Sequence, residues 1–145
     1  MQNIKEIPVE STLQVRNEVL RPNQPIASCS FDGDNLPSTH HFGFFNDENI
    51  VGIISAFART NPNWSIQQQL QVRGMAVLQN FQKKGIGEHL ISHVISFAQE
   101  NNIELIWMNA RKNAVPFYEK TGFHTYGTAF EIEGIGTHFL MYRLL

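Results

Sequence analysis

The sequence contains very little cysteine: Cys29 is the only one among its 145 residues. A single cysteine excludes a disulfide within the chain and leaves no cysteine cluster of the kind that holds zinc. Long apolar runs are also missing, since no stretch approaches the length of a membrane span. The first residues, MQNIKEIPVE, have no apolar core typical of a secretory signal. We therefore expect a cytoplasmic protein that does not bind a membrane.

An excess of basic residues is absent as well. Eleven Lys and Arg stand against thirteen Asp and Glu, which gives a formal net charge of −2 at pH 7. Proteins that bind nucleic acids usually carry a basic face, so this balance argues against nucleic acid as a partner. The length and the 42% hydrophobic content predict one folded domain over residues 1–145.

Apolar periodicity predicts an α/β protein with one mixed sheet. Ser11 and Thr12 are expected to cap the first helix, and the NDEN turn is expected to join two strands into a hairpin. The predicted order of elements is β-α-β-β-β-α-β-α-β-β. The expected strands cover residues 3–9, 40–45, 50–58, 69–78, 103–110, 124–132 and 137–145, and the expected helices cover residues 13–20, the stretch after Gly87 and residues 113–122.

A turn rich in glycine and lysine, QKKGIG at residues 82–87, lies between a strand and a helix. Gly85 and Gly87 remove side chains where a phosphate would approach, and the helix N-terminus offers N–H groups and the positive end of a dipole. Lys83 and Lys84 add positive charge. The turn is neither a P-loop nor a dinucleotide fingerprint, because the residues that follow do not fit those motifs. From the residues alone, a phosphate cradle and an ordinary tight turn both remain open.

Two motifs follow one another along the chain: Gln82, Gly85 and Gly87 in the glycine turn, and the stretch NAVPFYEKTGF at 113–123. Together they resemble the motifs of the GNAT superfamily of N-acetyltransferases. The first matches its Gln/Arg-x-x-Gly-x-Gly/Ala signature between the fourth strand and the next helix, and the second matches a later segment that commonly accompanies the signature. The resemblance covers residues 40 to 145. A looser match to the ElaA-like branch lies in Arg16, Val19, Gln24, Pro25, DGDNL at 32–36 and His41.

The resemblance implies transfer of an acetyl group from acetyl-CoA to a primary amine of a small molecule or peptide. It also implies a mostly antiparallel central sheet flanked by helices, and dimers are common in the family, so a homodimer is one expected state. The pantetheine arm would pair with strand backbone, and the pyrophosphate would rest on the glycine turn. The residues implied to bind the cofactor are Met75, Ala76, Val77, Gln82, Lys83, Lys84, Gly85, Ile86, Gly87, Asn109, Asn113 and Tyr118.

Acetylation of an amine needs a proton donor for the leaving thiolate and a proton acceptor for the amine. Tyr118 matches the general acid of the family, and aromatic packing beside Phe117 is the alternative. Gln71 stands where histone-acetylating relatives carry a glutamate, and an amide cannot take a proton. His41, His138 and a chain of waters therefore remain open as the base.

The irregular region 21–40 is long for a simple connector, so we expect it to border the acceptor site. Four residues are candidates for contacts with the acceptor: Arg16, Asp34, His41 and Arg73. We expect no metal site, because the helical pair His89 and His93 has no evident third ligand.

Two other functions remain open. The glutamine at Gln71 leaves a CoA-binding regulatory module without turnover as an alternative. The second alternative function is that of a phosphate- or nucleotide-binding protein that uses the glycine turn differently. The identity of the acceptor does not follow from the sequence.

Overall fold

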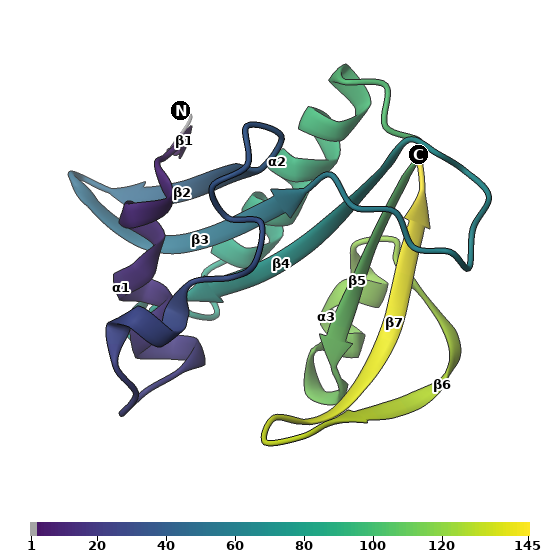
Figure 1. Cartoon of the computed structure of the whole chain (residues 1–145). Helices are drawn as coiled ribbons and strands as arrows, with labels where there is room; N and C mark the ends of the chain where they lie inside the picture. The colour runs from purple at the N-terminus through teal and green to yellow at the C-terminus, as the bar shows by residue number, and fades with distance from the viewer. Residues whose placement is uncertain (1–2) are drawn as a thin grey trace. The chain divides into compact units, whose positions relative to one another are not determined.

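The structure, a computed structural model that describes residues 3–145, contains a seven-stranded sheet with the order β1-β2-β3-β4-β5-β7-β6 (Figure 1). The pairs β1–β2, β2–β3, β5–β7 and β6–β7 are antiparallel, and β4–β5 is parallel. This arrangement confirms the predicted fold class and order of elements. The strands are β1 (Ile4–Glu6), β2 (His40–Asn46), β3 (Asn49–Phe57), β4 (Gln69–Val77), β5 (Leu105–Arg111), β6 (His124–Ile132) and β7 (Gly136–Leu144), and the helices are α1 (Leu13–Val15), α2 (Ile86–Glu100) and α3 (Val115–Lys120).

The chain divides into two compact units. The N-terminal unit comprises the chain up to Ala58 together with Val72–Val94, and the C-terminal unit comprises Arg59–Gln71 and Ile95–Leu145. Strand β4 and helix α2 each run from one unit into the other. The parallel pairing of Gln69–Gln71 with Leu105–Trp107 lies within the C-terminal unit.

The first helical segment is longer and less regular than the sequence predicts. A 3-10 turn, Val9–Thr12, precedes α1, and a π-helical turn, Arg16–Leu20, follows it. The predicted cap by Ser11 and Thr12 is wrong. Thr12 lies inside the helical run, and its hydroxyl donates a hydrogen bond to the Val9 carbonyl at 2.7 Å, so it does not bind the free N–H groups of a helix start.

Helices α1 and α2 cover opposite faces of the strands in the N-terminal unit, as Figure 1 shows. Val15 of α1 packs with Ile53 of β3 in a core cluster. A Cβ on the neighbouring Gly52 would lie 2.9 Å from Ile86 of α2. Successive strand residues point to opposite faces, which places the two helices on opposite sides. The predicted apolar stripe of α2 is confirmed by the burial of Leu90, Ile91, Val94, Ile95 and Ala98.

In the C-terminal unit, the end of α3 and the segment around Trp64 lie on opposite faces of the sheet. Arg143 of β7 donates a hydrogen bond to the Thr121 carbonyl, just after α3, at 2.6 Å. The ring of the adjacent residue, Tyr142, lies 5.3 Å from the ring of Trp64. Because β7 pairs with β5 in unbroken register, His138 points to the same face as Tyr142 and away from α3.

Gly122 closes α3, as predicted. Its φ of +93° is favourable for glycine, and a Cβ here would come within 3.0 Å of the Arg143 guanidinium. The N–H of Phe123 returns to the Tyr118 carbonyl at 3.1 Å and ends the helix.

Candidate active site

The turn before α2 has a sharply bent and open backbone. Lys83 and Gly85 both have left-handed conformations, with φ of 63° and 83°. A Cβ on Gly85 would touch only the ring of His89, at 3.9 Å, so space remains beside the turn. The His89 N–H donates to the Gly85 carbonyl, so the N–H groups just before it have no intrahelical partner. Turns of this kind form concavities in which backbone N–H groups bind anions.

The side chain of Gln82 ties this turn to the end of β4. Its Nε2 donates a hydrogen bond to the Val77 carbonyl at 2.9 Å. Lys83 and Lys84 are exposed, so their charges can reach a ligand in solution. The predicted cofactor residues 75–77 and 82–87 therefore lie on connected segments of the N-terminal unit.

A glycine in left-handed conformation precedes the predicted pantetheine-binding stretch of β4. Gly74 has a φ of +65°, and a Cβ there would lie only 2.8 Å from the ring of Phe31. A glycine within a strand often marks a close approach of another group, and here the missing Cβ leaves room for the Phe31 ring. Ala76 is buried in the core with Ile53, so its side chain anchors the strand.

Arg16 and Asp34 form a buried ion pair in the N-terminal unit. Both side chains are 1% exposed, and Nη1 and Nη2 of Arg16 lie 2.7 and 3.0 Å from the two carboxylate oxygens. Burial would raise the pKa of Asp34. The hydrogen bonds from Arg16 and from the Phe31 N–H, together with the Arg16 charge, outweigh burial and hold the pKa below its ordinary value. The pair fixes the region 21–40 against the first helical segment.

His41 belongs to the same buried network. Its Nε2 donates to the Asp34 backbone carbonyl at 3.0 Å, and its Nδ1 accepts from the Ser55 hydroxyl at 2.7 Å. The Ser55 oxygen in turn accepts from Arg16 Nη2 at 3.2 Å. Both ring nitrogens are engaged, so His41 has no lone pair left for a substrate proton.

The burial of Arg16, Asp34 and His41 does not fit the direct contact with an acceptor that the sequence led us to expect. Arg73 lies differently. It is half-buried, with its Cζ 4.5 Å from the ring of Phe31 and 5.4 Å from the ring of Phe57. Among the four predicted acceptor residues, Arg16, Asp34 and His41 are buried, and only Arg73 is partly exposed to solvent.

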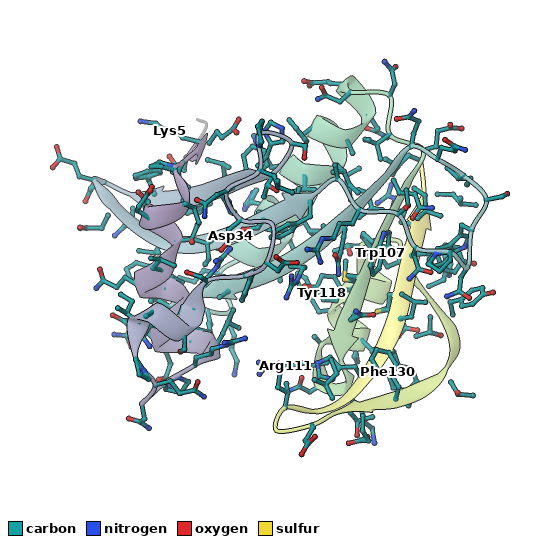
Figure 2. All side chains as sticks on the ribbon, in the orientation of Figure 1. Lys5, Asp34, Trp107, Arg111, Tyr118 and Phe130 are labelled. Atoms are coloured by element: carbon teal, nitrogen blue, oxygen red, sulfur yellow. The ribbon has the colours of Figure 1, made fainter. Side chains whose placement is uncertain are left out.

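Tyr118 lies on α3 in the C-terminal unit (Figure 2). The side chain is 7% exposed, and its ring packs 5.1 Å from that of Phe117 and 6.0 Å from that of Phe123. Burial raises the pKa of the Tyr118 phenol well above its ordinary value, so the hydroxyl keeps its proton at neutral pH. The packing alternative and the donor role are compatible, because the ring packs while the hydroxyl remains a donor.

Three further predicted residues lie in the C-terminal unit. Asn109 and Asn113 are exposed, on β5 and on the 3-10 turn before α3. The Nδ1 of His138 lies 2.8 Å from the Gly136 carbonyl.

Gln71 is 5% exposed, and its Oε1 is buried without a hydrogen-bond partner among the described residues. The described residues contain no group of three His, Cys, Asp or Glu that could hold a metal ion.

Some residues of the site carry no signal in the sequence. Ser55 and Phe31 connect the buried pair to β3 and β4, and nothing in their local sequence distinguishes them. None of the helices described in residues 3–145 is long and apolar enough to cross a membrane.

Comparison with known proteins identifies the class. A family model described as Acetyltransferase (GNAT) domain matches residues 19–144. The chain therefore belongs to the GNAT acetyltransferase family, which confirms the resemblance found in the two motifs. Because it belongs to this family, it is an acetyl-CoA-dependent acyltransferase. It is 33% identical over 145 residues to the uncharacterized N-acetyltransferase YitI of Bacillus subtilis, covering 100% of this chain and 97% of YitI.

Solved structures share the fold at low sequence identity. Escherichia coli ElaA superposes with a TM-score of 0.78 at 15% identity, over 99% of both chains. An aminoglycoside 6'-N-acetyltransferase complexed with coenzyme A superposes with a TM-score of 0.73 at 14% identity, over 99% of this chain and 97% of that one.

Proposed function

We propose that this protein moves an acetyl group from acetyl-CoA to a primary amine of a small molecule or peptide, with Tyr118 as general acid. The observation that carries the proposal is the bent turn at 82–87, which offers unpaired N–H groups and two exposed lysines at the start of α2. A shared fold with a coenzyme A complex supports the same ligand here.

The residues of the N-terminal unit fit the parts of coenzyme A by their chemistry. The N–H groups of residues 83–87 would bind the pyrophosphate, with the Lys83 and Lys84 ammonium groups nearby. The backbone of Met75–Val77 would pair with the pantetheine arm as an added strand. An N–H near Val77 would face the thioester oxygen, where negative charge grows during the reaction. Acetyl-CoA supplies the activated acetyl group.

The C-terminal unit supplies the proton donor. Tyr118 holds a proton at neutral pH and donates it toward the departing sulfur. Because burial makes the phenol a weaker acid than free tyrosine, the hydroxyl acts first as a hydrogen-bond donor and the proton follows as charge builds on sulfur. Asn109 and Asn113 are exposed and would contact the cofactor with their amide groups.

The acceptor would lie beside the region 21–40. In this proposal Arg16 and Asp34 do not touch the acceptor but hold the region in place through their buried pair. Arg73 remains a candidate for direct contact, because its half-buried guanidinium can bind an acidic group of the acceptor.

Gly87→Glu is expected to lower the affinity for acetyl-CoA at least about ten-fold. A carboxylate would stand where the pyrophosphate binds, and like charges repel. A glutamate in the first turn of α2 favours the helix, so folding should be preserved. Isothermal titration with acetyl-CoA measures the affinity, and the rise in melting temperature on binding gives a second readout.

Ser92→Glu is the matched control, since Ser92 is exposed farther along α2 and the added charge is the same. This variant should bind acetyl-CoA like the wild type. A folded Gly87→Glu protein with unchanged affinity would show that the turn does not bind the pyrophosphate.

A further inference from the structure

A pocket of about 530 Å³ lies within the N-terminal unit. Its volume falls in the range of roughly 300–1,000 Å³ that is typical of small-molecule sites. One wall is the first helical segment, and another is the β2–β3 turn with Asn46 and Asn49 on either side. None of the residues that line it is among those predicted to bind the cofactor or the acceptor. The pocket is therefore a candidate site that the acetyl transfer does not use.

The inner surface of this pocket is apolar. Val15 of α1 and Val51 of β3 line it and are buried, and Leu78 and Phe81 line it and are half-buried. These side chains come from three segments that are far apart in the sequence, so the fold alone brings them together. A chain of methylene groups that covered them would be removed from water, which favours binding.

The rim of the pocket is negatively charged. Glu10, Glu18 and Glu48 line it and are exposed, whereas the described lining residues include no Lys, Arg or His. Glu10 and Glu18 lie on one side of the helical segment, each four residues from Gln14, and the Gln14 Nε2 donates to Glu18 Oε1 at 3.3 Å. Glu48 adds a third carboxylate from the β2–β3 turn.

These three carboxylates lack positive partners in the part of the chain that the structure describes. None of them forms an ion pair with a residue in 3–145. Apart from the contact of Glu18 with Gln14, their oxygens accept no hydrogen bond from a described residue. Like charges around one pocket repel one another, and a ligand that carries positive charge would remove this repulsion.

We propose that this pocket binds a protonated aliphatic di- or polyamine. Its ammonium groups contact the three rim carboxylates, and its methylene chain covers Leu78 and Phe81. A neutral apolar ligand would leave the carboxylates without a counter-charge, and a metal ion would leave the apolar surface uncovered. A protein partner fits less well, because none of the large apolar side chains that are exposed in residues 3–145 lines the pocket. The proposal does not depend on the acetyl transfer.

Isothermal titration with 1,6-diaminohexane, in the absence of acetyl-CoA, measures the binding without turnover. Glu10→Gln, Glu18→Gln and Glu48→Gln combined in one variant should weaken binding at least about five-fold. Each exposed ion pair contributes little, and three together contribute enough to measure. The matched control removes three exposed carboxylates of the C-terminal unit, Glu100→Gln, Glu104→Gln and Glu133→Gln, and should bind the diamine like the wild type.

Methyl NMR of the wild-type protein locates the bound diamine. The methyl signals of Val51 and Leu78 should shift with 1,6-diaminohexane and stay in place with 1,6-hexanediol, which has the same chain without charge. Diamine that binds without shifting these signals, or that does not bind at millimolar concentration, would overturn the proposal. Equal weakening in the two triple variants would also overturn it, because net charge alone would then explain the effect.

A single substitution keeps the test decisive where the triple variant does not fold. Glu48→Gln changes one exposed side chain in the β2–β3 turn and should weaken binding about two-fold. Unchanged affinity for the diamine in this variant, with the triple variant unfolded, would count against the pocket as the site.

Discussion

Asp34→Asn is expected to lower the free energy of unfolding by about 3–5 kcal/mol. The substitution removes the carboxylate charge and leaves the Arg16 guanidinium buried without a counter-charge, with its side chain 1% exposed. A protein of this kind has a total stability of roughly 5–15 kcal/mol, so the loss takes a large share. Urea unfolding followed by circular dichroism gives the difference between variant and wild type.

Asp47→Asn is the matched control for this change. Asp47 lies in the exposed β2–β3 turn with a φ of 56°, a conformation that asparagine also tolerates. The control should change stability by less than about 0.5 kcal/mol. If Asp34→Asn unfolds at the same urea concentration as Asp47→Asn, the buried pair does not hold the region 21–40.

The same pair predicts how stability depends on acid. The pKa of Asp34 is lower in the folded protein than in the unfolded chain, where aspartate titrates near about 3.9. Its contribution is therefore complete above that value and is lost as the pH falls through the lower folded pKa. Below about pH 4 the wild type should lose stability more steeply than Asp34→Asn, as measured by urea unfolding across that range. Equal slopes would show that Asp34 does not titrate as part of the pair.

Tyr118→Phe is expected to lower kcat on the order of 10²-fold, a typical contribution of a general acid. The phenylalanine ring keeps the contacts with Phe117 and Phe123 and removes only the hydroxyl. Affinity for acetyl-CoA should change little, because the lost interaction strengthens as charge develops on sulfur. Single-turnover kinetics with acetyl-CoA and an amine acceptor measures the chemical step directly.

The control for this variant is Tyr126→Phe, which removes the same hydroxyl from an exposed ring on β6. It should turn over like the wild type. A Tyr118→Phe enzyme with the wild-type single-turnover rate would assign the residue to packing and place the acid elsewhere.

Much of the fold could be predicted from the sequence because its signals are local. The alternation of apolar runs and turns gave the correct order of elements, and Gly122 and the NDEN turn marked ends that the structure has. Motif spacing around Gln82 and Tyr118 led to the correct family, since both motifs occupy short continuous stretches. Local patterns were less successful at Thr12, where a 3-10 turn continues into the helix and the hydroxyl bonds a carbonyl.

The site depends on contacts that no local pattern reveals. Arg16 and Asp34 are 18 positions apart, and as isolated residues each resembles a surface charge available to substrate. Only the fold shows that they bond each other and that Ser55 connects them to His41.

The central claim, that this protein acetylates primary amines with acetyl-CoA, is tested most directly by coupling the two products in one assay. Thiol release from acetyl-CoA and the mass of the acceptor are followed together for spermidine, kanamycin, alaninamide and an alanine-ended peptide. The account predicts that at least one amine gains a single acetyl group for each thiol released. At acetyl-CoA concentrations below saturation, Gly87→Glu should lower both signals while Ser92→Glu retains them. Tight binding of acetyl-CoA without any acetylated amine, or thiol release that Gly87→Glu leaves unchanged, would contradict it.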